Sequence, residues 1–194
     1  MRKLKLQVQM TIDGFIAGPN GEQDWMTFTW AEKLADFVND LTDSSDTILL
    51  GRKMSADFLP YWTKAAADPD SPENEFAHKM VDTRKVLFSK TLKSIDYKNT
   101  TIASGDLFEE VNKLKQEEGK DIIVYGGASF DASLISAGLI DEFYLFINPV
   151  AIGDGLSIFK KGDQQKLELI DAHPFEDGIV VMHYRPKDHS HEQH

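Results

Sequence analysis

Short apolar segments alternate with segments of helical periodicity over most of this chain, and three apolar segments then follow one another directly. The alternating apolar segments cover residues 4–12, 46–51, 85–90 and 121–125. The consecutive ones cover residues 141–153, 166–175 and 178–186. Strands that alternate with helices indicate a parallel sheet flanked by helices, and consecutive strands indicate antiparallel pairing. We therefore predict an α/β fold with a mixed, mostly parallel central sheet and antiparallel strands at its C-terminal edge.

Local signals set the expected element boundaries. Leu4–Ile12 alternates apolar and polar residues, which predicts a half-buried first strand. A helix is expected to begin near Arg52 and to end before Pro60, because proline interrupts helical hydrogen bonding. Helices are also expected over residues 30–41, 73–82, 107–119 and after 127, a short strand around residue 102 and a surface loop over 64–76. We expect a single domain over residues 1–186 and a disordered polar tail over 187–194.

Charge and composition exclude several classes of protein. Twenty-one Lys and Arg residues against 32 Asp and Glu residues give a net charge of -11, which disfavours a nucleic-acid partner. No apolar run is long enough to span a membrane, and the N-terminus lacks the apolar core of an export signal. The chain has no cysteine, so we expect a cytoplasmic location and no thiolate metal site. The histidines of the tail, 189, 191 and 194, are not expected to form a designed metal site.

Four turns directly follow the predicted parallel strands. They are Asp13-Gly14, Gly51-Arg52-Lys53, Ser89-Lys90 and Gly126-Gly127-Ala128-Ser129. The carboxyl ends of parallel strands meet at one edge of a sheet, where ligands of open α/β folds bind. These turns are therefore the first place to look for a site.

Two of the turns suit an anionic ligand. Gly126 and Gly127 either make a plain strand-to-helix turn or let the backbone approach a phosphate at a helix N-terminus. The pair lacks the G-x-G-x-x-G spacing of a Rossmann fold. Arg52 and Lys53 are either solvated or placed to bind a phosphomonoester such as the 2′-phosphate of NADP. Cations at a helix N-terminus oppose the helix dipole, so an anionic ligand would offset the cost of their position.

Other residues near these turns have two readings each. Asp13 either begins a tight Asp-Gly turn or hydrogen-bonds a substrate and relays a proton. Tyr125, just before the glycines, packs in or over the site or donates a proton. Trp25 and Trp30 either line a pocket for a flat heterocycle or pack in the core.

Taken in order, these segments resemble the dihydrofolate reductase-like superfamily, and within it the reductase domain of bacterial riboflavin biosynthesis. The residues that carry the resemblance are MTIDGFIAGPNGEQDW (10–25), ILLGRKMSADFLPYW (48–62), VLFSKTL (86–92), IIVYGGASFDASLISAGLIDEF (122–143) and NPVAIGDGLSIF (148–159). The resemblance implies a three-layer α/β/α fold, NADPH as reductant and a homodimer. By position in the motifs it assigns cofactor binding to Gly51, Arg52, Lys53, Ser89, Lys90, Gly126, Gly127, Ala128 and Ser129.

The chain departs from the resemblance at two places. Met54 stands where relatives carry a threonine, so a hydroxyl contact to phosphate is missing unless Ser55 supplies it. The acidic residue that true dihydrofolate reductases carry on the first helix corresponds to Ala35, and Asp36 next to it points about 100° away on a helix. Dihydrofolate is therefore a poor candidate for the substrate.

The resemblance leads to one main hypothesis and several rivals. The main one is an NADPH-dependent reductase acting on a small flat heterocycle, similar to 5-amino-6-(5-phosphoribosylamino)uracil reductase, with Asp13 as the polar catalytic group and Trp25 and Tyr125 at the substrate pocket. The rivals are a reductase of an unrelated pterin or carbonyl compound, a non-catalytic NADP(H)-binding module, and a relative that keeps the fold without the cofactor. A flavin in place of NADPH also stays open.

Overall fold

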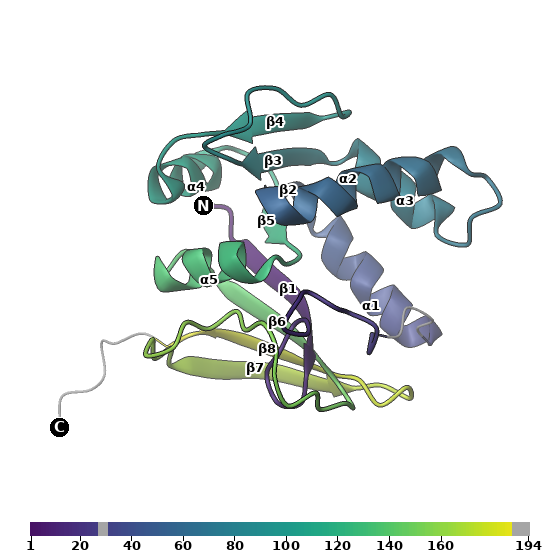
Figure 1. Ribbon diagram of the computed structural model, residues 1–194, viewed down its shortest axis with the longest axis vertical. Coiled ribbons are helices and arrows are strands. Elements are labelled where there is room, and N and C mark those ends of the chain that lie inside the picture. The colour runs from purple at the N-terminus through teal and green to yellow at the C-terminus, as the bar shows by residue number, and fades with distance from the viewer. Residues whose placement is uncertain (27–30, 188–194) are drawn as a thin grey trace.

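The computed structural model describes residues 1–26 and 31–187, and its strands there join in one eight-stranded sheet (Figure 1). The strand order is β4-β3-β2-β5-β1-β6-β8-β7. The strands are β1 (Leu4–Thr11), β2 (Ser45–Gly51), β3 (Arg84–Phe88), β4 (Thr100–Ala103), β5 (Asp121–Val124), β6 (Glu142–Asn148), β7 (Leu167–Pro174) and β8 (Val180–Pro186). Strands β1 to β6 pair in parallel, whereas β8 pairs antiparallel with both β6 and β7. The predicted fold class, including its antiparallel C-terminal edge, is confirmed.

Helices cover both faces of this sheet and make three layers (Figure 1). They are α1 (Glu32–Asp43), α2 (Arg52–Ala67), α3 (Asn74–Asp82), α4 (Leu107–Gln116) and α5 (Ala128–Ser136). Buried residues of α4 and α5 pack in one core, and those of α1, α2 and α3 pack in another. Within the described ranges no helix is long and apolar enough to cross a membrane.

The central strands divide their side chains between the two cores. Ile48 and Leu50 of β2 belong to the core beneath α1, α2 and α3, and Leu49 between them belongs to the opposite core. Strand β5 divides Ile122, Ile123 and Val124 in the same way. Because successive side chains of a strand point to opposite faces, a strand covered on both faces needs an unbroken apolar run.

Strand β1 is more buried than its sequence predicts. Seven of its eight residues are buried, including Lys5 and Gln7 on its polar face. The Lys5 ammonium lies 2.8 Å from a carboxylate oxygen of Asp121 and donates to the Ser44 hydroxyl at 2.9 Å. The prediction of a half-buried strand was wrong because helices cover both faces, and alternation reports polarity rather than exposure.

Helix α2 also differs from its expected length. It passes through Pro60 and ends at Ala67, so the predicted stop before the proline was wrong. Phe58 and Leu59 before the proline and Trp62 after it pack against the same core, and this burial outweighs the lost backbone hydrogen bond. The predicted loop over 64–76 shrinks to the residues between α2 and α3, where the side-chain amide of Asn74 donates to the carbonyl oxygens of residues 65, 66 and 68.

Candidate functional site

The register of the sheet places three of the four predicted turns side by side. Gly51 at the end of β2 lies opposite Phe88 at the end of β3, and Leu49 of β2 lies opposite Val124 at the end of β5. The turns that open with Ser89, Arg52 and Tyr125 therefore leave adjacent strands at one edge. The turn of Asp13 follows β1, the next strand beyond β5.

Two helices begin at this edge without a side-chain cap. Helix α2 starts at Arg52 after Gly51, and α5 starts at Ala128 after Gly127, and neither preceding residue makes a side-chain cap hydrogen bond. The first amide groups of a helix have no partner within the helix and attract anions. Gly126 and Gly127 have φ angles of 151° and 102°, which only glycine adopts readily. The backbone conformation of this turn is therefore enough by itself to require glycine at both positions.

The two helix starts pack against each other through single side chains. A Cβ atom on Gly51 would lie 2.7 Å from the Cβ of Phe130 in α5, closer than real Cβ atoms approach one another. On the other side of this contact, Met54 of α2 lies against the Gly126–Gly127 turn, with its Cβ 3.7 Å from the position of a Cβ on Gly127. Gly51 is thus required by the neighbouring helix α5, whereas its own backbone, with φ of -78°, would accept other residues.

Three exposed cations border this edge. Arg52 and Lys53 open α2, and Lys90 follows β3. Within residues 1–26 and 31–187 no ion pair joins any of them to a carboxylate. They form a local basic group in a chain of net charge -11.

Two serines near the cations have structural roles. The buried Ser89 hydroxyl accepts hydrogen bonds from the backbone N–H groups of Thr91 at 3.3 Å and Leu92 at 3.0 Å, which shapes the turn that carries Lys90. The Ser55 hydroxyl is buried and donates to the carbonyl oxygen of Arg52 at 2.7 Å. Ser55 is therefore already engaged and does not face a ligand as a substitute for a hydroxyl at position 54. Ser129, in the first turn of α5, is exposed.

Asp13 joins two loops at the strand ends. Its carboxylate accepts hydrogen bonds from the backbone N–H groups of Ile152 at 3.1 Å and Gly153 at 2.7 Å. Hydrogen bonds from the Thr11 hydroxyl, and then from the Gly153 backbone, lower the pKa of Asp13. This carboxylate is exposed and held in its ionised form, which suits a hydrogen-bond acceptor better than a proton donor.

The aromatic residues assigned to the substrate pocket are placed differently from one another. Trp25 is half-buried in the loop after Asp13. Tyr125 packs into the core beneath α1, α2 and α3, where its ring stacks on Phe58 with centroids 6.2 Å apart and its hydroxyl lies 3.2 Å from that of Thr42. Burial raises the pKa of the Tyr125 hydroxyl, so it stays neutral. Trp30 lies outside the described residues, as do the histidines of the tail.

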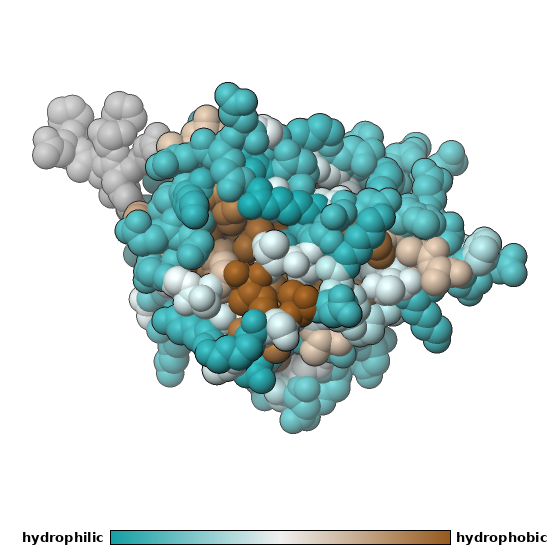
Figure 2. Space-filling model, turned by 90° about the horizontal axis from the view of Figure 1, so that it is seen from above, coloured by the Kyte–Doolittle hydropathy of each residue, from teal (hydrophilic) through white to brown (hydrophobic). Residues whose placement is uncertain are grey.

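Two phenylalanines at this edge were missed in the sequence. Phe88 and Phe130 are half-buried, and their ring centroids are 5.3 Å apart. The signal was present, since Phe88 directly precedes Ser89 and Phe130 follows the glycine turn by three residues. Seen from the side of β4, the molecule shows apolar side chains gathered in the middle of a face with a hydrophilic rim (Figure 2).

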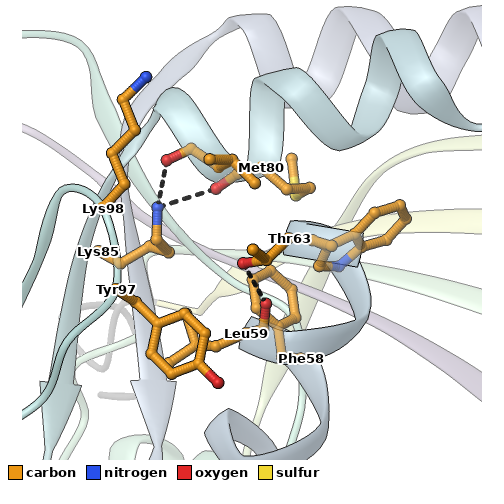
Figure 3. Close-up of a pocket in the computed structure, with 9 residues that line it drawn as sticks. Phe58, Leu59, Thr63, Met80, Lys85, Tyr97 and Lys98 are labelled. Carbon is orange, nitrogen blue, oxygen red and sulfur yellow. Dashed lines mark hydrogen bonds between the residues drawn. The ribbon is translucent and has the colours of Figure 1, made fainter. Parts of the chain in front are cut away.

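A small cavity elsewhere is separate from these turns. It is lined by residues of α2 and α3, by Lys85 at the start of β3, and by Tyr97 and Lys98 (Figure 3). The Lys85 ammonium donates to the carbonyl oxygens of Met80, Val81 and Thr83 at 3.0, 2.7 and 2.7 Å, and burial lowers its pKa to about 8. These bonds close the C-terminal end of α3, so the lysine is structural. No group of three potential metal ligands occurs in the described part of the chain.

Residues 2–181 match the RibD C-terminal domain family. This chain belongs to that family. The family is that of the reductase domain of RibD, which confirms the resemblance drawn from the motifs. The uncharacterized protein YyaP of Bacillus subtilis is 40% identical over 185 residues, which cover 94% of each chain.

Solved structures agree on the fold of this RibD C-terminal domain. A putative riboflavin biosynthesis protein from Shewanella has a TM-score of 0.72 at 18% identity and is matched over 97% of this chain and all of its own. Dihydrofolate reductase from Enterococcus faecalis, complexed with NADP(H), has a TM-score of 0.59 at 13% identity, over 96% of this chain and 97% of that one. At these identities the likeness concerns the fold alone.

Proposed function

We propose that this RibD C-terminal domain is an NADPH-dependent reductase that transfers hydride to a small heterocyclic substrate. The observation that carries the proposal is a group of three cations, Arg52, Lys53 and Lys90, that have no ion-pair partner among the described residues and lie beside two uncapped helix starts. A monophosphate near the guanidinium and a pyrophosphate near the backbone amides match this charge pattern. The Enterococcus dihydrofolate reductase, similar in fold, is a complex with NADP(H), which supports the choice of cofactor.

In this proposal each turn has a separate task. Arg52, Lys53 and Lys90 bind the 2′-phosphate end, and the turn over Gly51 and Ser89 supports it. Gly126, Gly127, Ala128 and Ser129 bind the pyrophosphate through backbone groups. The bound nicotinamide would supply the hydride, while the protein orients the substrate and excludes competing reactions.

The substrate end lies toward Asp13. We propose that Asp13 orients the substrate as a hydrogen-bond acceptor, directly or through the loop that holds Ile152 and Gly153, and that water delivers the proton. Trp25, in the loop that follows, is the proposed aromatic wall, while Tyr125 would support the site from below. Reduction of the ribosylamino-pyrimidine of riboflavin synthesis is the best-defined candidate reaction. Ala35 and the exposed Asp36 on α1 offer no inward acid, which disfavours dihydrofolate.

The test is a titration of the purified protein with NADPH and NADH, followed by tryptophan quenching. NADPH should bind more tightly than NADH. Arg52→Ala should lower the affinity for NADPH at least about tenfold and should change the affinity for NADH little, because a charge-assisted hydrogen bond contributes about 1.5–3 kcal/mol. Lys64→Ala, at the other end of α2, is the matched control. Equal affinities for the two cofactors would disprove the 2′-phosphate assignment.

Activity decides between an enzyme and a non-catalytic NADP(H)-binding module. A reductase should oxidise NADPH with at least one member of a panel of pyrimidines, pterins, quinones and carbonyl compounds. With such a substrate, Asp13→Asn should raise KM, and unchanged KM and kcat would exclude a role for Asp13. Tight NADPH binding without turnover across the panel would favour the module.

A further inference from the structure

Met54 occupies the space over the glycine turn at the start of α5. Its sulfur is 3.8 Å from the Cβ position of Gly126, and in the described part of the chain no other heavy atom beyond the neighbouring residues lies within 4 Å of that position. Its Cβ also lies 3.7 Å from the Cβ position of Gly127. Met54 therefore covers both glycines from the side of α2.

The chemistry of Met54 does not suit a phosphate. A thioether is a weak hydrogen-bond acceptor and offers no donor to an anion. Yet Met54 stands in the first turn of α2, two residues after Arg52, and its side chain lies against the glycine turn. A phosphate that contacts Gly126 on the side facing α2 would compete with the Met54 thioether for this space.

Phe130, the other side chain at this contact, is fixed more firmly. It packs on Gly51 and lies against Phe88, so its ring has partners on two strands. Met54 is half-buried, and an unbranched side chain with several rotatable bonds changes conformation easily. Of the two, Met54 is the one that can turn aside.

We propose that Met54 determines the affinity of this site for dinucleotides by covering Gly126 with its thioether, and that the thioether must rotate away before a pyrophosphate can contact the turn at Gly126. The inference rests on the proposed NADP(H) site. The cost of holding Met54 aside lowers the affinity for ligands that reach the glycine turn. Ligands that contact only Arg52, Lys53 and Lys90 do not bear this cost.

The test compares two ligands on three proteins. NADPH contains the pyrophosphate bridge, whereas adenosine 2′,5′-bisphosphate keeps the 2′-phosphate and lacks the bridge. The proteins are the wild type, Met54→Ala, which opens the space, and Met54→Leu, which keeps the side-chain volume. Thermal unfolding verifies that each variant is folded, and Met54→Val, which also lacks a hydroxyl, replaces the alanine variant if that one does not fold.

Met54→Ala should tighten NADPH binding about five- to tenfold, because the cost of holding one side chain in an unfavourable rotamer is removed. Its affinity for adenosine 2′,5′-bisphosphate should stay within about twofold of that of the wild type. Met54→Leu should behave like the wild type toward both ligands. Unchanged or weaker NADPH binding by Met54→Ala, while the wild type binds NADPH, would overturn the inference and leave the proposed function intact. If no protein binds either ligand, the inference and the proposed function fail together.

Discussion

At the scale of single residues, Asp131 is the least expected feature. It lies in the first turn of α5, is fully buried, and neither of its carboxylate oxygens has a hydrogen-bond partner among the described residues. Burial raises the pKa of Asp131 well above its usual value. Such a group favours the protonated form in the folded protein and the ionised form in the unfolded chain.

This difference makes stability depend on pH. Because the folded state binds a proton that the unfolded state has lost, stability decreases as pH rises from about 4 toward the folded-state pKa, by about 1.4 kcal/mol for each pH unit. Asp131→Asn keeps the shape and removes the titration. The variant should match the wild type near pH 4 and become progressively more stable than it toward pH 7, as measured by urea unfolding. Parallel stability curves for the two proteins would contradict a buried, neutral Asp131.

At the scale of elements, the contact between α2 and α5 depends on Gly51. Gly51→Ala should destabilise the protein by about 1–3 kcal/mol, because its Cβ would meet the Cβ of Phe130, which a side-chain rotation cannot move. Gly105→Ala is the control, since there a Cβ meets the flexible carboxylate end of Glu110. The measurement is the free energy of unfolding in urea.

A second substitution separates this contact from a backbone effect. If the clash is the cause, Phe130→Gly, which removes the Cβ that an alanine would keep, should recover part of the loss in Gly51→Ala, so the two changes should be non-additive. Simple additivity would place the cost of Gly51→Ala in its own turn instead.

At the scale of the whole molecule, one continuous sheet supports both cores, and a single domain over residues 1–186 stays our prediction. The predicted disordered tail over 187–194 lies outside the described residues except for Lys187, whose backbone N–H donates to the carbonyl oxygen of Lys166 at 2.9 Å. The sheet ends in β7, where Leu169 and Ile170 are 52% and 45% exposed. An edge strand with apolar side chains is normally covered in a soluble protein. We therefore expect a homodimer in solution, as the family resemblance implies. Light scattering should give about twice the chain mass of 21.9 kDa at micromolar concentration, and a monomer at all concentrations would disprove the dimer.

The sequence by itself determined the class of sheet and the edge where the candidate site lies. Apolar runs such as 46–51 and 121–125 mark strands because side-chain direction in a strand is a local property. Parallel strands bring their carboxyl ends to one edge, so the turns at Gly51, Ser89 and Gly126 could be grouped without a structure. Both inferences need only the order and polarity of residues close together in the chain.

Only the tertiary structure decided how these turns are filled. The contacts of Met54 with the glycine turn, of Phe130 with Gly51, and of Asp13 with Ile152 and Gly153 join residues that are 72 or more positions apart. The burial of the polar face of β1 and the passage of α2 through Pro60 also reflect packing that overrides a local preference. The physical reason is the same in each case: the helices and loops that make these contacts are positioned by the whole core, and no local pattern encodes which side chains they bring together.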